Sequence, residues 1–258
     1  MIHEIIAVVK EAGRIVINAG NIQGGIESKE GRANFVTKYD VEVQRFLISE
    51  LVKLYPQATF IGEEDDNKEF PGEYCFIIDP IDGTTNFIQD CRHSAISVGL
   101  MYQGQMIEGV VYDPYLDELF YAVRGTGAFL NDKPLRMPDL PLGSGLVCVG
   151  TSPYYREKAE GTFALARKLY DQALDIRRSG SAALDICYVA AGRYVLYFEF
   201  KLSPWDYAAG SLILEEAGGR MSVIGGGELP LVHGCSVVAA TPKAYEEFKE
   251  INDIFNEQ

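Results

Sequence analysis

The spacing of apolar residues changes partway along the chain, and this change limits the folds open to it. Residues 2–16 and 40–54 carry apolar side chains at helical spacing. Short apolar segments rich in β-branched and aromatic residues come next, at residues 74–78, 94–101, 106–112 and 118–123. Turn residues separate these segments, as expected for hairpins. Two helices followed by hairpin-like strands predict an α+β first half.

The second half of the chain alternates strands with helices. The predicted strands cover 146–150, 194–200 and the surroundings of 221 and 237, and the predicted helices cover 156–170, 181–191, 204–217 and 245–255. Between the halves, residues 132–145 carry three prolines and two glycines, a composition typical of a connection. We therefore expect an N-terminal half over residues 1–143 and a C-terminal α/β half over 144–258, packed as one compact unit.

Charge and cysteine content argue against several classes of protein. The 258 residues include 23 Lys plus Arg against 37 Asp plus Glu, which gives a formal net charge of −14. Such a surface repels phosphate backbones and anionic membranes, so we expect neither a nucleic-acid nor a membrane partner. The five cysteines form no Cys-x-x-Cys pair, which favours reduced thiols. The sequence shows neither a signal-peptide core nor a membrane-spanning stretch, and we expect a cytoplasmic location.

One segment, Ile77 to Phe87, combines two carboxylates with a turn. We expect a buried strand to end at Asp79, Pro80 to stop the strand pairing, and a helix to open just after Asp82. Mg²⁺ prefers oxygen ligands such as these carboxylates, and the free amides at a helix start can bind phosphate. The segment alone is equally compatible with a Pro-containing turn in which Asp82 caps the helix.

Two further acidic segments are likewise compatible either with a metal site or with an ordinary structural feature. Glu63 and Glu64 follow the apolar residues 60–62, where like charges repel unless a cation intervenes. Asp206 falls in the first turn of the helix predicted at 204–217. Taken alone, the first segment is compatible with a solvated loop, and the second with an acidic first turn favoured by the helix dipole.

Together these motifs, Gly-Glu-Glu, Asp-Pro-Ile-Asp-Gly-Thr-Thr-Asn-Phe and Trp-Asp-x-Ala-Ala-Gly with a later Glu-Ala-Gly-Gly, resemble the inositol monophosphatase family. The similarity extends to residues 34–40 and 180–183 and so covers nearly the whole chain. It implies an α+β fold, the layered αβαβα sandwich of the sugar phosphatases. It also implies Mg²⁺-dependent hydrolysis of a phosphomonoester, inhibition by lithium, and a homodimer.

The resemblance implies metal ligands by position. Glu63, Asp79 and the backbone carbonyl of Ile81 match the ligands of one Mg²⁺. Asp79, Asp82 and Asp206 match those of a second, and Glu64 is a candidate ligand for a third, weakly held ion. A water on the first ion becomes a better nucleophile because its pKa falls, while the second ion stabilises the departing alkoxide, so no covalent phosphoenzyme is needed.

The resemblance also implies catalytic and substrate-binding residues. Thr84, paired with Asp40, matches the group that orients the attacking water, and Glu63 acts through its metal. The other matches are substrate contacts: the phosphate-binding amides of Gly83 and Thr84, the carboxylates Asp82 and Asp206, and the positions Gly180, Ser181, Ala182 and Glu199. Lys29 aligns with a basic loop residue near the metals and is equally compatible with a solvated lysine.

The expected substrate is a small phosphorylated polyol or sugar, with inositol 1-phosphate as the first choice. Fructose 1,6-bisphosphate is an alternative, alone or alongside it, because Arg177, Arg178 and Arg193 could bind a second phosphate. The Thr85–Asn86 pair favours the inositol branch over phosphatases of phosphoadenosine phosphate. A further alternative is a noncatalytic transcription-associated factor, since some bacterial members of the resembled family join transcription complexes.

Overall fold

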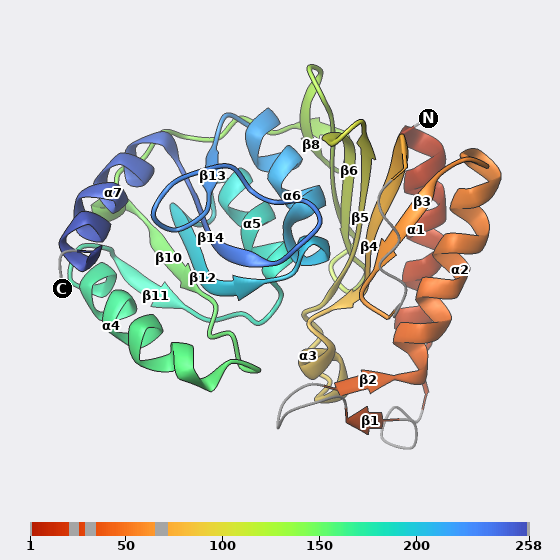
Figure 1. Cartoon of the computed structure of the whole chain (residues 1–258), viewed down its shortest axis with the longest axis horizontal. Coiled ribbons are helices and arrows are strands. Elements are labelled where there is room, and N and C mark those ends of the chain that lie inside the picture. The colour runs from red at the N-terminus through yellow and green to blue at the C-terminus, as the bar shows by residue number, and fades with distance from the viewer. Residues whose placement is uncertain (1, 21–25, 29–34, 65–71, 257–258) are drawn as a thin grey trace.

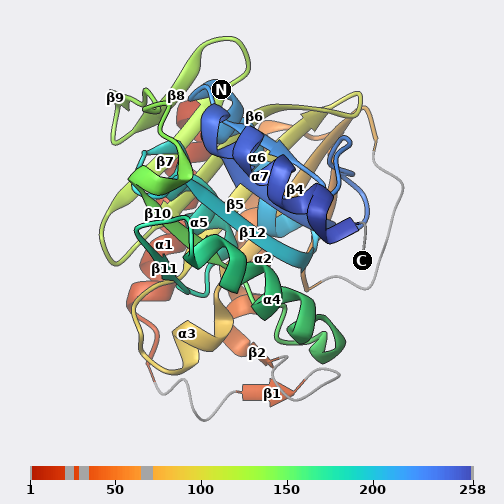
Figure 2. The same cartoon turned by 90° about the vertical axis from the view of Figure 1, so that its left-hand side faces the viewer.

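Helices and sheets alternate in five layers in the computed structural model (Figure 1), which describes residues 2–20, 26–28, 35–64 and 72–256. The outer layer on one side holds α1 (Ile2–Ile17) and α2 (Lys38–Leu54), and the central helical layer holds α5 (Ala182–Ala190) and α6 (Pro204–Glu216). The opposite outer layer holds α4 (Ala159–Tyr170) and α7 (Pro242–Asn256), which cover the outer face of the second sheet (Figure 2). The predicted α+β fold with αβαβα layering is confirmed. Lys29 lies outside the described residues.

The larger sheet has seven strands in the order in which they occur along the chain. They are β3 (Thr59–Gly62), β4 (Tyr74–Asp82), β5 (Ala95–Tyr102), β6 (Gln105–Asp113), β7 (Glu118–Val123), β8 (Gly127–Leu130) and β9 (Lys133–Pro134). Only β3 and β4 pair in parallel, and the other neighbours are antiparallel, as the hairpin pattern predicted. A separate antiparallel pair joins β1 (Ile26–Ser28) to β2 (Phe35–Thr37).

The smaller sheet has five strands in the order β11–β10–β12–β14–β13. They are β10 (Leu146–Val149), β11 (Asp175–Arg177), β12 (Leu196–Leu202), β13 (Arg220–Ser222) and β14 (Cys235–Ala240). The strand β10 pairs in parallel with β11 and β12, while β14 pairs antiparallel with β12 and β13. Two short 3-10 turns, Leu142–Ser144 and Arg156–Lys158, precede β10 and α4. Residue 143, the predicted boundary, lies between the last strand of the first sheet and the first strand of the second.

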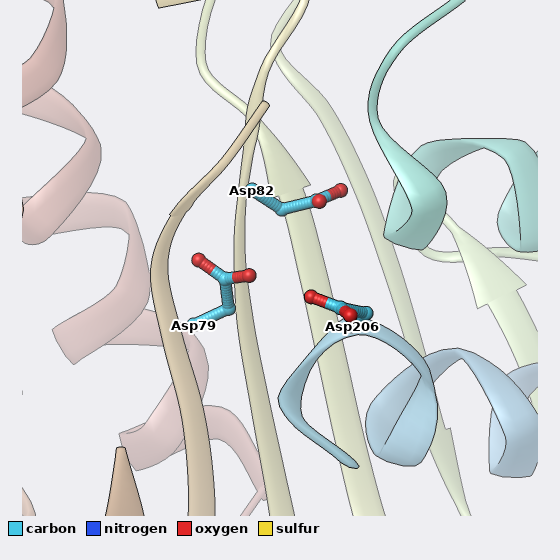
Figure 3. Close-up of side chains that lie close together, drawn as sticks. All are labelled: Asp79, Asp82 and Asp206. Atoms are coloured by element: carbon cyan, nitrogen blue, oxygen red, sulfur yellow. The ribbon is translucent and has the colours of Figure 1, made fainter. Parts of the chain in front are cut away.

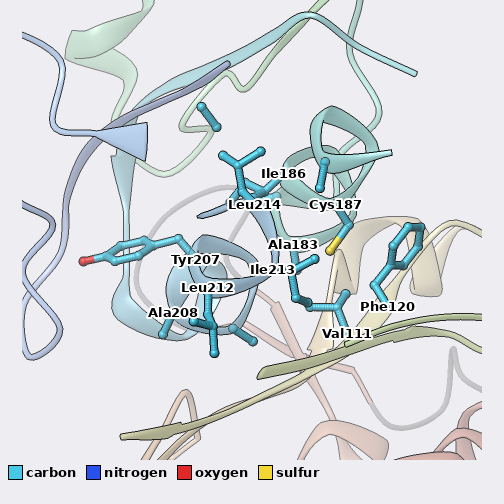
Figure 4. Close-up of a cluster of buried hydrophobic side chains, with 14 of the residues drawn as sticks. Val111, Phe120, Ala183, Ile186, Cys187, Tyr207, Ala208, Leu212, Ile213 and Leu214 are labelled. Atoms are coloured by element: carbon cyan, nitrogen blue, oxygen red, sulfur yellow. The ribbon is translucent and has the colours of Figure 1, made fainter. Parts of the chain in front are cut away.

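The central helices pack tightly between the two sheets. Figure 4 shows part of this core, in which Leu212 and Ile213 of α6 belong to one buried cluster with Val111 and Phe120 of the larger sheet. Glycines permit the close approach, because a Cβ added at Gly109 would lie 2.7 Å from the carbonyl oxygen of Ala209. The N-terminal half of α6 is thereby held against the larger sheet. Among the described helices, none has the length and apolar character needed to cross a membrane.

Candidate metal centre

Three aspartates from two distant parts of the chain meet where the larger sheet faces the central helices. Asp79 and Asp82 come from the end of β4, and Asp206 comes from the first turn of α6 (Figure 3). Each offers a carboxylate oxygen, and these oxygens all lie within 4.8 Å of one another. Asp79 and Asp82 are only 1% and 7% exposed. An oxygen-only donor set of this kind fits Mg²⁺, which binds carboxylates together with water and substrate phosphate.

The end of β4 differs from the prediction in a way that shapes the site. Strand pairing was expected to stop at Pro80, but β4 continues to Asp82. Asp79 pairs with Ser97 and Asp82 with Ala95, so β4 carries one residue more than β5 in this interval. The extra residue makes a bulge that accommodates the proline, which has no N–H to donate. The Ile81 N–H donates instead to Asp79 Oδ1 at 3.0 Å and helps to fix that carboxylate.

Capping interactions fix the other two carboxylates. Asp206 closes a capping box with Ser203, whose N–H donates to Asp206 Oδ2 at 2.6 Å. Asp82 Oδ2 accepts hydrogen bonds from the Ser181 hydroxyl and, at 2.8 Å, from the Ala183 N–H at the start of α5. Both helices of the central layer therefore begin at the cluster, and Ser181 is held beside Asp82.

The carboxylates raise one another's pKa. Burial is the largest cause of the raised pKa of Asp79, and the charges of Glu63 and Asp82 raise it further. Burial also raises the pKa of Asp206 well above its ordinary range, with added repulsion from Asp82 and Glu63. Burial raises the pKa of Asp82 to about 6 even though Ser181 and Ala183 stabilise its charged form. A divalent cation would offset this repulsion, so the electrostatics agree with the donor set.

Thr84 and Asp40 lie together beside the cluster. The Thr84 hydroxyl donates to Asp40 Oδ1 at 3.2 Å, with the Ile81 carbonyl oxygen at the same distance. Asp40 is fully buried at the start of α2, where its Oδ2 accepts from the Thr37 N–H at 2.7 Å in a capping box. Burial raises the pKa of Asp40. The Thr84 hydroxyl is thus fixed against a carboxylate that accepts protons more readily than an exposed aspartate does.

The expected helix after Asp82 is short. It is α3 (Thr84–Ile88), a single turn, so its dipole is small. Gly83 precedes it at φ +93°, and a Cβ there would lie 3.0 Å from the Gly180 carbonyl oxygen, so glycine is the residue that fits. Any phosphate bound here would rely on the individual amides of Gly83 and Thr84 more than on a helix dipole.

The cluster forms one wall of a cavity of about 330 Å³. The cavity lining includes most of the predicted site residues, namely Glu63, Asp79, Ile81, Asp82, Gly83, Thr84, Gly180, Ser181, Ala182, Glu199 and Asp206, but neither Asp40 nor Glu64. Asp40 reaches the site through Thr84. The Glu64 N–H donates to the Gln44 side chain at 3.0 Å. The predicted residues therefore converge on one cavity.

Sequence reasoning missed several other residues of the cavity lining. Ser152, Tyr154, Tyr155 and Lys201 also line the cavity, and no motif pointed to them. A signal was available in the position of residues 151–155, directly after the predicted strand 146–150, because binding residues often follow the end of a sheet strand.

Of the three arginines considered for a second phosphate, only Arg178 lines this cavity. Arg177 pairs with Asp175, and Arg193 makes a two-point ion pair with Glu118. The expectation that Arg177 or Arg193 could serve the site is therefore not supported by their placement.

The chain belongs to the inositol monophosphatase family, whose family model matches residues 1–256. Inositol-1-monophosphatase of Rhizobium meliloti is 38% identical over 247 residues, covering 95% of this chain and 92% of the relative. The Nus factor SuhB of Escherichia coli strain K12 is 37% identical over 246 residues, covering 94% and 92%. An IMPase of Thermotoga maritima has a solved structure with a TM-score of 0.88 and 30% identity, covering 98% of this chain and 96% of that one. Relatives at similar identity thus carry two different kinds of name.

Proposed function

We propose that this protein is a Mg²⁺-dependent phosphatase that hydrolyses inositol 1-phosphate to inositol and phosphate. The observation that carries the proposal is the convergence of Asp79, Asp82 and Asp206 on a cavity wall, next to the Thr84–Asp40 pair. A cavity of about 330 Å³ is at the lower end of the usual range for small-molecule sites. The name of the Rhizobium meliloti relative supports the choice of substrate.

Two ions would be held by the carboxylates. The proposed ligands of one ion are Glu63, Asp79 and the Ile81 carbonyl. Those of the other ion are Asp79, Asp82 and Asp206. Glu64 is a candidate ligand for a third ion. When bound, the ions supply positive charge that attracts the phosphate into an acidic cavity and favours deprotonation of water. The protein fixes the carboxylates through Ile81, Ser181 and Ser203, so little rearrangement is needed on binding.

Proton transfer is assigned to Thr84 and Asp40. The Thr84 hydroxyl donates to Asp40 Oδ1, so its own oxygen is free to accept a proton from the attacking water. As it accepts that proton, Thr84 passes its own proton to Asp40. The raised pKa of Asp40 favours this second transfer. Direct attack by water then needs no covalent intermediate with the protein.

The substrate is placed by the remaining lining residues. The amides of Gly83 and Thr84 are proposed to bind phosphate, and Asp82 and Asp206 to contact the substrate as well as the metal. Gly180, Ser181 and Ala182 offer the wall for the alcohol, because the hydrogen bonds of Ser181 and Ala183 to Asp82 hold this segment against the cluster. Glu199 also lines the cavity.

One feature favours a bisphosphate as a second candidate substrate. Arg178 and Lys201 are the cations that line the cavity within the described part of the chain. In the described part of the chain, neither side chain forms an ion pair with a carboxylate within 4.0 Å, whereas most of the other described arginines do. Such cations could bind the second phosphate of fructose 1,6-bisphosphate.

The name Nus factor, carried by the Escherichia coli relative, supports a different candidate, a noncatalytic role in transcription. The intact arrangement of Asp79, Asp82, Asp206, Thr84 and Asp40 favours catalysis instead. Capture of transcription proteins by a variant that has lost its metal ligands, together with negligible phosphatase activity of the wild type, would support the transcription role.

The deciding experiment compares kcat/KM for inositol 1-phosphate, fructose 1,6-bisphosphate and phosphoadenosine phosphate with Mg²⁺ present. The proposal predicts the highest value for inositol 1-phosphate and inhibition of its hydrolysis by lithium. A higher value for fructose 1,6-bisphosphate would favour the second candidate, and no hydrolysis of any substrate would refute the phosphatase assignment. Light scattering during size-exclusion chromatography tests the implied homodimer.

A further inference from the structure

Two adjacent tyrosines stand at the cavity with their rings partly open to solvent. Tyr154 and Tyr155 line the cavity and are 44% and 40% exposed. Aromatic rings beside a polar cavity provide apolar surface, which suits the C–H faces of a sugar or cyclic polyol. Burial raises the pKa of Tyr154, and the charges of Glu63 and Asp206 raise it further.

The backbone that presents these rings is fixed at Ser152. This residue is 2% exposed and has φ +42°, in the left-handed region that residues other than glycine rarely adopt. The Ser152 N–H donates to Glu199 Oε1 at 2.5 Å, and its hydroxyl accepts from the Lys201 N–H at 3.0 Å. The Tyr155 N–H donates to the Ser152 carbonyl at 2.8 Å and closes a turn. Contacts with β12 thus hold the unusual conformation.

Glu199 is engaged with the protein through both carboxylate oxygens. Oε1 accepts from Ser152, and Oε2 accepts from the Tyr197 hydroxyl at 2.7 Å. The side chain is 7% exposed and fills the space beneath Gly150, where an added Cβ would lie 2.0 Å from Glu199 Oε2 and 2.7 Å from Glu199 Cβ. A glycine at 150 and a carboxylate at 199 therefore fit each other, and both lie under the segment that carries the tyrosines.

We propose that Tyr154 and Tyr155 form a specificity-determining face for the ring of a cyclic polyol or sugar phosphate. In this arrangement Glu199 also acts as a positioning residue, because its carboxylate holds Ser152. The inference rests on the proposed phosphatase function, since it concerns how that site selects its alcohol. It assigns to Tyr154 and Tyr155 a role that none of the sequence motifs indicated.

The first test compares a cyclic with an acyclic substrate. Tyr154→Ala and Tyr155→Ala are expected to raise the KM for inositol 1-phosphate about three- to tenfold more than the KM for glycerol 2-phosphate, which has no ring. Tyr170→Ala is the matched control, because Tyr170 is also an exposed tyrosine, at 49%, but lies on α4 and does not line the cavity. Equal changes for the two substrates, in an active protein, would overturn the inference alone. A wild type inactive on both substrates would remove the proposed function and this inference with it.

The second test separates positioning from charge at Glu199. Glu199→Gln keeps an oxygen for the Ser152 N–H and gains an amide that can donate to the Tyr197 hydroxyl, so it is expected to retain the preference for the cyclic substrate. Glu199→Ala is expected to lose it. Gly150→Ala should lose it as well, because the added methyl displaces Glu199 without removing its charge. Gly161→Ala is the control, since its Cβ would meet nothing nearer than Phe200 at 3.9 Å. A Glu199→Gln variant as impaired as Glu199→Ala would refute the positioning role.

Discussion

Removing the charge of Asp82 should stabilise the metal-free protein while it abolishes function. The pKa of Asp82 is raised from 3.8 to about 6 in the fold, mainly because the side chain is buried. A rise of about 2 pKa units at about 1.4 kcal/mol each amounts to roughly 3 kcal/mol at neutral pH. Asp82→Asn should recover most of this free energy, because its amide oxygen can still accept from Ser181 and Ala183, which both bond to Asp82 Oδ2. Its NH₂ group would face the carboxylates of Asp79 and Asp206.

The sign of the pH dependence follows from the raised pKa. The native protein keeps a proton on Asp82 up to about pH 6, whereas the unfolded chain releases it near pH 3.8. The native state thus holds more protons across this window, and the free energy of unfolding falls as the pH rises through it. Burial raises the pKa of Asp79, Asp206 and Asp40 in the same direction. The difference between the wild type and the variant reports the charge of Asp82 together with its repulsion of Asp79 and Asp206.

The assay is urea unfolding in EDTA at several pH values. At pH 7.5 the Asp82→Asn variant should unfold with a free energy about 3 kcal/mol higher than the wild type, and the gap should close as the pH approaches 4. Mg²⁺ should stabilise the wild type more than the variant. Glu42→Gln, at an exposed position on α2, is the control and should change little. A variant no more stable than the wild type at pH 7.5 would refute the reasoning.

Three other perturbations test separate parts of the site. Gly83→Ala forces a side chain into φ +93° and should cost about 1–2 kcal/mol in urea unfolding as well as slow turnover; unchanged stability would contradict the glycine requirement. Thr84→Ala should lower kcat by about 10²- to 10⁴-fold while Thr84→Ser keeps most of it, and equal loss in both would argue against a role for the hydroxyl. Arg178→Ala should raise the KM for fructose 1,6-bisphosphate by about tenfold or more if that substrate binds with its second phosphate on the arginine, with little change for inositol 1-phosphate.

The periodic elements could be predicted because their patterns are strong and local. The hairpin strands of the larger sheet and the amphipathic helices, such as α1 with Ile5 and Val9 buried, were found within a few residues of their ends. The strands β1, β2, β8, β9 and β11 were not predicted, since each has only two to four residues and too little pattern to separate it from a turn. The bulge at Pro80 also escaped prediction, because it depends on pairing with β5.

The candidate site was predicted only where motifs carried it. The resemblance to the family indicated the acidic residues and Thr84. Spacing alone could not show that Ser181 lies beside Asp82, which is 99 residues earlier in the chain. The placement of Tyr154 and Tyr155 depends on the left-handed backbone conformation of Ser152, which is held by Glu199, 47 residues later. Contacts between segments so far apart are set by how the two sheets pack around α5 and α6, which the local sequence does not encode.

The central claim is that the aspartate cluster holds the metal that makes this protein a phosphatase. The most direct measurement is phosphate release from inositol 1-phosphate as a function of Mg²⁺ concentration, for the wild type, Asp79→Asn and Asp206→Asn, with folding checked by urea unfolding. We predict that the wild type needs Mg²⁺ and that both variants fold but lose kcat by orders of magnitude. Full activity of the wild type in EDTA, or near-normal turnover in either variant, would contradict the account.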